Sequence, residues 1–453
     1  MKQWRERVVA HVEHELSVDV RALALMRIAF GLLVIVDAFA RMGDARVFYS
    51  DEGFLPRSDI ALHSFWGFRL YLLSGAPAWT TALLAATVVV AFAFAIGWQT
   101  RVMNALTWML LGSLHARNEL VLQGGDTLLL NMLMWSLMLP LGARWSVDAR
   151  RERSPDRVTG AACVALYLQM FLVYFVTGTL KTNYAHWWLG EGVQHALSAD
   201  HLVTAFGRWL RPHTTLLALL TWATLALEII GPFLLLLSPA RSRMRLFLVV
   251  SFILFHAGIA LTLELGLFSF VCMACWLFAL PSWVFDRRQK EPTEGRASPR
   301  WVGILATALA GYLVFATIVR DRLKDTSVRH ALLWPAHTLR FQLIWDLFIG
   351  PREDSGWNVL PAITPDGREI DLLRNGVPLS WEPPVDVAET FPNQRWRKLL
   401  VTFRKERSRV ALGRYLAWLC TTEKVTEVRF VYMKHAPGEA FSTPEVIAQL
   451  RCE

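Results

Sequence analysis

Residues 174–188 read YFVTGTLKTNYAHWW, and this stretch marks the point where an apolar helix runs out into a tryptophan-rich segment. Its one lysine, Lys181, lies at the end of that helix. A lysine at that depth in a membrane loses hydration, so we expect its pKa to fall and its amine to be available as a base. The alternative is an interfacial lysine that snorkels to the lipid headgroups, remains charged and has no chemical role.

The composition is typical of a membrane protein. Of the 453 residues, 54% are hydrophobic and 20 are tryptophan, and the mean hydropathy is +0.33, whereas soluble domains are about 45–50% apolar. The net charge is +9, but the basic residues collect in short loops between apolar segments. This distribution favours association with a lipid bilayer and argues against nucleic-acid binding.

Nine apolar segments are each long enough, or nearly so, to cross about 30 Å of hydrocarbon. They are residues 22–42, 79–98, 102–116, 126–142, 158–180, 214–238, 246–263, 265–284 and 301–319. The third and fourth are short, which fits tilted or partly re-entrant helices. No cleavable signal peptide is expected before the first segment, which would itself direct insertion.

The loops predict how these spans are oriented. With nine spans, four basic clusters fall on one face, and the positive-inside rule makes that face cytoplasmic. The clusters are Lys2, Arg5 and Arg7; Arg144, Arg150, Arg151, Arg153 and Arg157; Arg241, Arg243 and Arg245; and Arg287, Arg288, Lys290, Arg296 and Arg300. We therefore expect the N-terminus in the cytoplasm and the C-terminus outside.

After the last span the composition becomes that of a soluble domain. Residues 356–373 (GWNVLPAITPDGREIDLL) predict two strands around a Pro-Asp-Gly turn, residues 394–420 have helical periodicity, and residues 425–433 (VTEVRFVYM) predict a further strand. The expected fold class is a polytopic α-helical membrane protein over residues 1–319, with a small extracytoplasmic α+β domain over residues 320–453. This domain is expected to cap or complete a site in the membrane domain.

The sequence does not predict a disulfide framework from its five cysteines, which are Cys163, Cys272, Cys275, Cys420 and Cys452. The C-x-x-C motif at 272–275 lies inside an apolar segment, where packing in the core is favoured over a redox or metal role. No metal, haem or nucleotide motif is present. Chemistry would therefore be carried out by side chains and a bound organic molecule.

Ionisable groups inside spans are costly, and each is a candidate for function. Within the spans these groups are Asp37, Glu228, His256 and Arg27. Arg27 is near enough to the cytoplasmic end of its span to face lipid headgroups. At the outer end of the spans lie His115, Arg117, Asn118, Glu119, Asp126 and Lys181. Convergence at one depth favours a membrane-embedded site. The alternative is a structural network of ion pairs, such as Asp37–Arg117 or Glu228–His256.

The ordered set of motifs resembles the vitamin K-dependent γ-carboxylase and its bacterial relatives, the HTTM (horizontally transferred transmembrane) domain proteins. The similar segments are residues 25–57, YFVTGTLK (174–181), FHAGIALTLELGLFSFVCM (255–273), IWDLF (344–348), PDGRE (365–369), RWRK (395–398), YLAWLC (415–420) and KVTEVRFVYM (424–433). The resemblance covers nearly the whole chain and implies a bacterial inner-membrane protein.

The resemblance implies a reaction with a quinol. The lysine, here Lys181, deprotonates reduced vitamin K or a menaquinol-like quinol, O₂ adds, and the resulting base removes a γ-hydrogen from a glutamate in a peptide or protein. The carbanion captures CO₂ and the quinol leaves as its epoxide, with no metal involved. The candidate catalytic residues are Lys181, Asn118 and Glu119, and the candidate quinol-binding residues are His115, Arg117, Asp126, Tyr174 and His256.

Two departures from the carboxylase pattern leave other functions open. The carboxylase has Asn-His where this chain has Asn118-Glu119, and a doubled lysine where Leu180 precedes Lys181. The first hypothesis is a carboxylase-like enzyme, a lyase and monooxygenase that carboxylates glutamate or only epoxidises the quinol. The second is a non-catalytic scaffold or a quinone- or lipid-binding protein that retains the fold. A transporter is the third, weakened by the odd span count and the lack of an inverted repeat.

Overall fold

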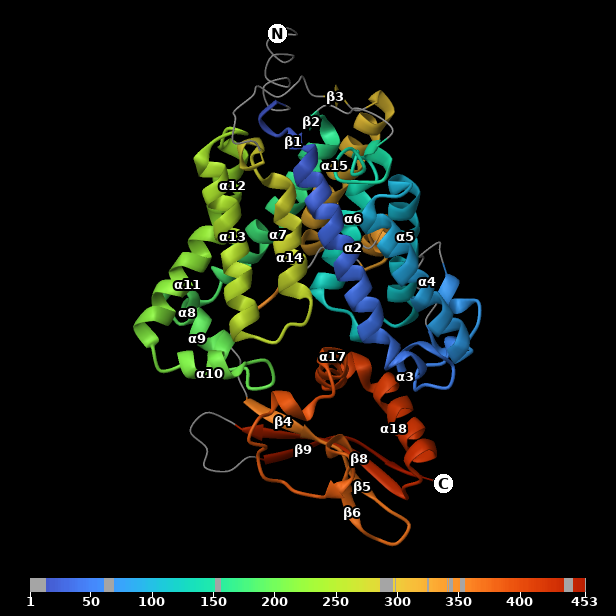
Figure 1. Ribbon diagram of the computed structural model, residues 1–453. Coiled ribbons are helices and arrows are strands. Elements are labelled where there is room, and N and C mark those ends of the chain that lie inside the picture. The colour runs from blue at the N-terminus through green and yellow to red at the C-terminus, as the bar shows by residue number, and fades with distance from the viewer. Residues whose placement is uncertain are drawn as a thin grey trace.

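A bundle of helices forms one end of the molecule and a small sheet with two helices forms the other (Figure 1). The computed structural model describes residues 14–60, 69–150, 156–285, 296–297, 299–323, 326–339, 341, 345–350, 355–435 and 443–452. One predicted basic cluster lies wholly outside these ranges (Lys2, Arg5 and Arg7), and parts of two others do as well (Arg151 and Arg153; Arg287, Arg288 and Lys290).

The bundle confirms a helical membrane protein, and each of the nine predicted segments coincides with one helix or a pair. The helices are α2 (Val20–Met42), α4 (Pro77–Ile96), α5 (Thr100–Arg117), α6 (Gly124–Ser136), α7 (Ala161–Lys181), α11 (Thr214–Ile229), α12 (Gly231–Leu237), α13 (Arg243–Thr262), α14 (Phe268–Trp276), α15 (Arg300–Arg322) and α16 (Thr326–Thr338). Among the described residues, α2, α4, α7, α13 and α15 are long and apolar enough to cross a membrane, and α11 with α12 makes a sixth if the bent pair is one span. The count of nine spans stays a prediction.

Local sequence explains how these helices begin, bend and pack. The helices α11 and α12 meet at an angle of 43°, where Gly231 and Pro232 interrupt the hydrogen-bonding pattern, because proline has no N–H to donate. The chain leaves α4 through Gly97, whose φ of 73° suits glycine. At Gly31 of α2 a Cβ atom would lie 2.6 Å from that of Ala95 in α4, so a glycine there permits close helix packing.

Short helices and a small sheet close the two ends of the bundle. At one end β1 (Val18–Asp19) pairs antiparallel with β2 (Arg157–Thr159), which pairs parallel with β3 (Arg296–Ala297). At the other end lie α3 (Ala45–Tyr49), α8 (Ala185–Trp188), α9 (Gly192–Leu197) and α10 (Ala205–Leu210). This second end faces the C-terminal sheet and its helix α17 (Gln394–Phe403) (Figure 1).

The C-terminal region is the predicted small α+β unit. Its sheet contains β4 (Ser355–Val359), β5 (Pro361–Ile363), β6 (Glu369–Asp371), β7 (Val377–Pro378), β8 (Glu427–His435) and β9 (Thr443–Arg451), in the order β4-β8-β5-β6-β7 with β9 also on β8. The antiparallel pair of β5 and β6 flanks the predicted Pro-Asp-Gly turn, and β8 is the strand predicted from VTEVRFVYM. Residues 394–420 form two helices, α17 and α18 (Arg409–Glu423), and the helix α15 runs past the predicted domain boundary at residue 319.

One hydrophobic cluster contains side chains from both regions. Side chains that follow α2, among them Phe48 and Phe54, pack with Phe403 and Tyr415 of the C-terminal helices. The ring centroids of Phe54 and Tyr415 are 5.7 Å apart. The C-terminal region therefore packs directly on the end of the bundle, as a cap would.

Two predictions about buried groups need correction. The guanidinium of Arg27 does not face lipid headgroups: it is fully buried and donates to the backbone carbonyls of Ala95, Leu141, Arg144 and Trp145, which replace its lost hydration. Two of the five cysteines, Cys420 and Cys452, form a disulfide between the end of α18 and the strand β9. Cys163, Cys272 and Cys275 are free and buried.

Candidate functional site

Lys181 is the last residue of α7, and its amine is buried in an ion pair with Glu228 of α11. The Nζ atom lies 2.6 Å from both Oε1 and Oε2 of Glu228, and the two side chains are 5% and 4% exposed. Gly178, one turn earlier, lets the two helices approach, because a Cβ there would lie 2.8 Å from Ile229 and 3.0 Å from the Glu228 side chain. Lys181 therefore does not extend to solvent or to headgroups, as the snorkelling alternative requires.

An indole ring covers the other side of this amine. The Nζ atom of Lys181 lies 4.8 Å from the ring of Trp187 in α8, within the range of a cation–π contact. The Nε1–H of Trp187 donates to the carbonyl of Ile349, 3.1 Å away, in the segment that leads toward the C-terminal sheet. Gly192 leaves room for this ring, since a Cβ there would lie 2.4 Å from it. Trp187 thus lies between Lys181 and residues 346–350.

A second polar group lies two helical turns back on the same face of α7. The hydroxyl of Tyr174 is 2.6 Å from Nε2 of His256 in α13, and it accepts a hydrogen bond of 2.9 Å from Nε1–H of Trp276 in α14. The Nδ1 atom of His256 is buried and has no hydrogen-bond partner among the described residues. A buried nitrogen without a partner can hydrogen-bond to a ligand hydroxyl.

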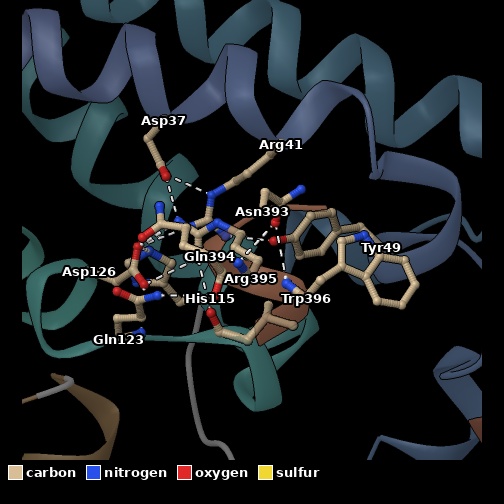
Figure 2. Close-up of polar contacts among 11 residues, drawn as sticks. Asp37, Arg41, Tyr49, His115, Gln123, Asp126, Asn393, Gln394, Arg395 and Trp396 are labelled. Carbon is tan, nitrogen blue, oxygen red and sulfur yellow. Dashed lines mark hydrogen bonds and ion pairs between the residues drawn. The ribbon is translucent and has the colours of Figure 1, made fainter. Parts of the chain in front are cut away.

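The end of α2 and the start of α6 meet the C-terminal region in a network of charges (Figure 2). Arg41 binds Asp37 at 2.7 Å, Asp126 at 2.8 Å and the Tyr49 hydroxyl at 2.6 Å. Arg395 of α17 binds both carboxylates, with Nη2 lying 3.0 Å from Oδ1 of Asp126. Two arginines and two aspartates balance in charge, as a structural network requires.

The position of Arg395 shows what this network does. Burial alone would lower the pKa of Arg395, but the Asp126 and Asp37 carboxylates outweigh burial and hold that pKa well above its usual value. Next to it, the Asn393 side-chain amide and the Trp396 indole N–H donate to the carboxylate of Asp44 at 2.7 and 2.9 Å. These contacts fasten the start of α17 to the end of the bundle.

The predicted cluster at residues 115–119 divides between buried and exposed side chains. His115 lies beside the network, with Nε2 4.0 Å from Oδ1 of Asp126, and Arg117 donates to the carbonyls of Ser50 and Leu55. The Asn118 amide donates to the carbonyl of Phe48 at 3.0 Å, and its oxygen accepts from the N–H of Leu120. Glu119 is exposed. The cluster therefore braces the loop that follows α2.

The structure forms a network of ion pairs, but with partners other than those the sequence suggested. Asp37 pairs with Arg41 and Arg395 instead of Arg117, and Glu228 pairs with Lys181 instead of His256. The i,i+4 spacing of Asp37 and Arg41 could have predicted one of these contacts. Arg395 is 358 residues from Asp37 and had no such signal. The roles predicted for the site residues stay predictions.

The comparisons with known proteins identify one family. The family model described as the HTTM domain matches residues 16–283, which include α2 to α14 and therefore Lys181, Glu228 and His256. No curated protein and no solved structure matches the chain.

Proposed function

The chain belongs to the HTTM domain family, and on that premise we propose that it is a quinol-dependent, γ-carboxylase-like membrane enzyme whose base is Lys181. The co-substrates would be O₂ and reduced vitamin K or a menaquinol-like quinol. The oxygenated quinol would be a base strong enough to remove a γ-hydrogen from a glutamate, which could then attack CO₂. The quinol would leave as its epoxide. Epoxidation without carboxylation is the narrower form of the same proposal.

The buried pair of Lys181 and Glu228 is the observation that carries this proposal. An amine can act as a base only in its neutral form, and a dry environment penalises separated charges. Movement of one proton along the 2.6 Å contact from Nζ to the Glu228 carboxylate leaves a neutral amine beside a neutral acid. Glu228 is thus proposed to hold the proton that Lys181 must lack before it can take one from a quinol hydroxyl.

The surrounding residues are suited to an aromatic guest. We propose that His256 Nδ1 hydrogen-bonds a quinol oxygen, that the Tyr174 hydroxyl orients His256 through its contact with Nε2, and that Trp187 keeps water from the amine. Tyr174 and Trp276 already pack together as an aromatic wall, with ring centroids 5.3 Å apart and ring planes tilted by 38°. A second polar nitrogen, His186 Nε2, is also buried without a partner among the described residues.

The proposal includes an orientation: the C-terminal domain lies outside the cytoplasm, and the membrane is a bacterial inner membrane. The disulfide of Cys420 and Cys452 supports it, because disulfides persist mainly in oxidising compartments. Alkaline phosphatase fused after residue 453 should then be active, and green fluorescent protein fused there should be dark. The reverse pattern would reject this orientation.

The test of the reaction uses purified protein in lipid nanodiscs with reduced menaquinone or vitamin K and O₂, and detects the quinone epoxide by mass spectrometry. Wild-type protein should form epoxide, and K181A should not. Because a single substitution leaves Glu228 buried and unpaired, K181M/E228Q is the matched control that removes the amine without leaving a charge. Epoxide formation by this double variant at the wild-type rate would reject Lys181 as the base.

A non-catalytic quinone- or lipid-binding protein is the second candidate. The specific observation in its favour is that Asn118 is engaged by backbone groups and that Glu119 is exposed, although this pair occupies the place of the carboxylase Asn-His. This candidate predicts saturable binding of a quinone without turnover. Product formation that requires both quinol and O₂ would reject it.

A further inference from the structure

A cleft of about 370 Å³ lies between the capped end of the bundle and α17. One wall comes from the loop of α9 and α10 and the turn before α14, and the opposite wall comes from α17. The segment 346–350, which accepts the hydrogen bond of Trp187, forms a third side. Neither Lys181 nor Glu228 lines this cleft, so it is distinct from their buried pair. Figure 1 shows α17 between the bundle and the sheet.

One face of α17 lines this cleft with cations. Gln394, Arg397, Lys398 and Val401 follow the i, i+3, i+4, i+7 spacing of a single helical face, and Lys405 lines the cleft from the turn after the helix. Arg397 already has a partner, because Nη1 lies 3.2 Å from Oε2 of Glu264 and Nη2 donates to the Glu264 carbonyl.

The two lysines have no such ion-pair partner in the part of the chain that the structure describes. Among the described residues no ion pair joins Lys398 or Lys405 to a carboxylate, and Asp346 is the one acidic residue in the lining. Burial, and after it the charge of Lys405, lowers the pKa of Lys398. The lining therefore favours an anionic group.

The remaining lining is apolar. Leu202, Leu265, Phe268, Leu347, Phe348 and Val401 face the same space. A ligand that satisfies both sides has an anionic head beside α17 and a hydrocarbon portion against these side chains.

The neighbouring surface indicates where such a ligand would come from. Exposed aromatic side chains surround this end of the bundle: Phe206 and Trp209 of α10 are 47% and 61% exposed, and Trp188 and Trp222 are 58% and 47% exposed. Aromatic rings of this kind gather at the level of lipid headgroups. The cleft is lined in part by His201 and Leu202, which directly precede α10. A ligand in the cleft therefore lies at the height of the membrane interface.

We propose that this cleft binds the phosphate headgroup of an anionic phospholipid, with Lys398 and Lys405 on the phosphate and the adjoining acyl chain against Leu265, Phe268 and Val401. This binding is independent of the quinol chemistry at Lys181. It would make the cap dependent on the composition of the membrane on which it lies.

The experiment measures lipid adducts of the purified full chain by native mass spectrometry. The probes are dioleoyl phosphatidylglycerol, neutral dioleoyl phosphatidylcholine, glycerol 3-phosphate and a glutamate-rich peptide. Phosphatidylglycerol should bind at concentrations at least tenfold lower than the other three. K398Q/K405Q should weaken its binding about tenfold or more, since each cation near an anionic headgroup contributes to affinity. K424Q/K434Q removes the same charge from lysines outside the cleft and should bind as the wild type does.

A second variant keeps the test valid if the charge change affects folding. V401W fills the apolar part of the cleft without changing its charge and should also weaken phosphatidylglycerol binding. Equal binding by wild type, K398Q/K405Q and V401W would overturn the proposal. So would preferential binding of the peptide, or equal binding of glycerol 3-phosphate, which would identify a soluble anion as the ligand.

Discussion

Removal of either partner of the Lys181–Glu228 pair should destabilise the protein far more than removal of both. Each carboxylate oxygen of Glu228 lies 2.6 Å from Nζ, and the two side chains are 5% exposed or less. Water therefore cannot replace the missing partner. We expect K181M or E228Q alone to cost about 3–5 kcal/mol, the usual effect of leaving one charge of a buried pair alone.

The double variant K181M/E228Q leaves no buried charge, and its stability should return to within about 1 kcal/mol of the wild type, because similar replacements of buried ion pairs are often neutral. The coupling free energy, which is the difference between the summed single losses and the loss in the double variant, would then be at least about 5 kcal/mol, well above what a double-mutant cycle can detect. Unfolding in mixed detergent micelles at increasing dodecyl sulfate, followed by tryptophan fluorescence and far-UV circular dichroism, measures all four proteins. Additive losses, with the double variant the least stable, would refute the pairing.

Three further predictions address the network, the helix contact and the histidine beside the site. R395M should leave Asp37 and Asp126 with only one of their two arginine partners. It should lower the free energy of unfolding by about 3–5 kcal/mol and make the C-terminal domain more sensitive to limited proteolysis. G178A should cost about 1–3 kcal/mol by forcing α7 from α11, whereas G258A, with open space around it, should not destabilise. Burial, and then His195, lowers the pKa of His186 below 6.5. The unfolded chain therefore takes up a proton before the folded protein does, and the stability of the wild type should decrease as the pH drops below about 6.5. This decrease should be steeper than in H186Q.

Each of these predictions has an outcome that contradicts it. The control is R407M, which removes the same charge at an exposed position. If R395M is proteolysed no faster than R407M, the network does not hold the C-terminal domain on the bundle. Equal stability of G178A and G258A would mean that α7 and α11 can separate without cost. Parallel stability curves for wild type and H186Q between about pH 5 and 7.5 would mean that His186 titrates alike in the folded and unfolded chain.

The helices could be predicted from the sequence because hydrocarbon thickness fixes their length and apolar content. The hairpin of β5 and β6 was predictable for a similar reason, since the Pro-Asp-Gly turn at 365–367 is a local signal. Apolar composition also predicts spans at α6 and α14, which contain 13 and 9 residues. Apolar composition does not distinguish a short buried helix from a membrane span.

The site could be predicted only in part, because its pairs join residues far apart in the sequence. Lys181 stood out as a single charge at the end of an apolar helix, but its partner is 47 residues away, and helix packing, not sequence spacing, decides which acid it contacts. The same holds for Arg395, which reaches Asp37 from another domain. Trp187 was hidden among neighbouring tryptophans, and only the fold shows which ring covers the amine.

The most direct test of the central claim is a density map of the protein in nanodiscs with a non-oxidisable analogue of reduced menaquinone. We expect the aromatic ring beside α7, with one ring oxygen within about 3 Å of Lys181 Nζ and the other side of the ring near His256. Trp187 should have moved to admit it. A ring bound elsewhere, with the lysine still covered by Trp187 and paired only to Glu228, would contradict the assignment of Lys181 as the base.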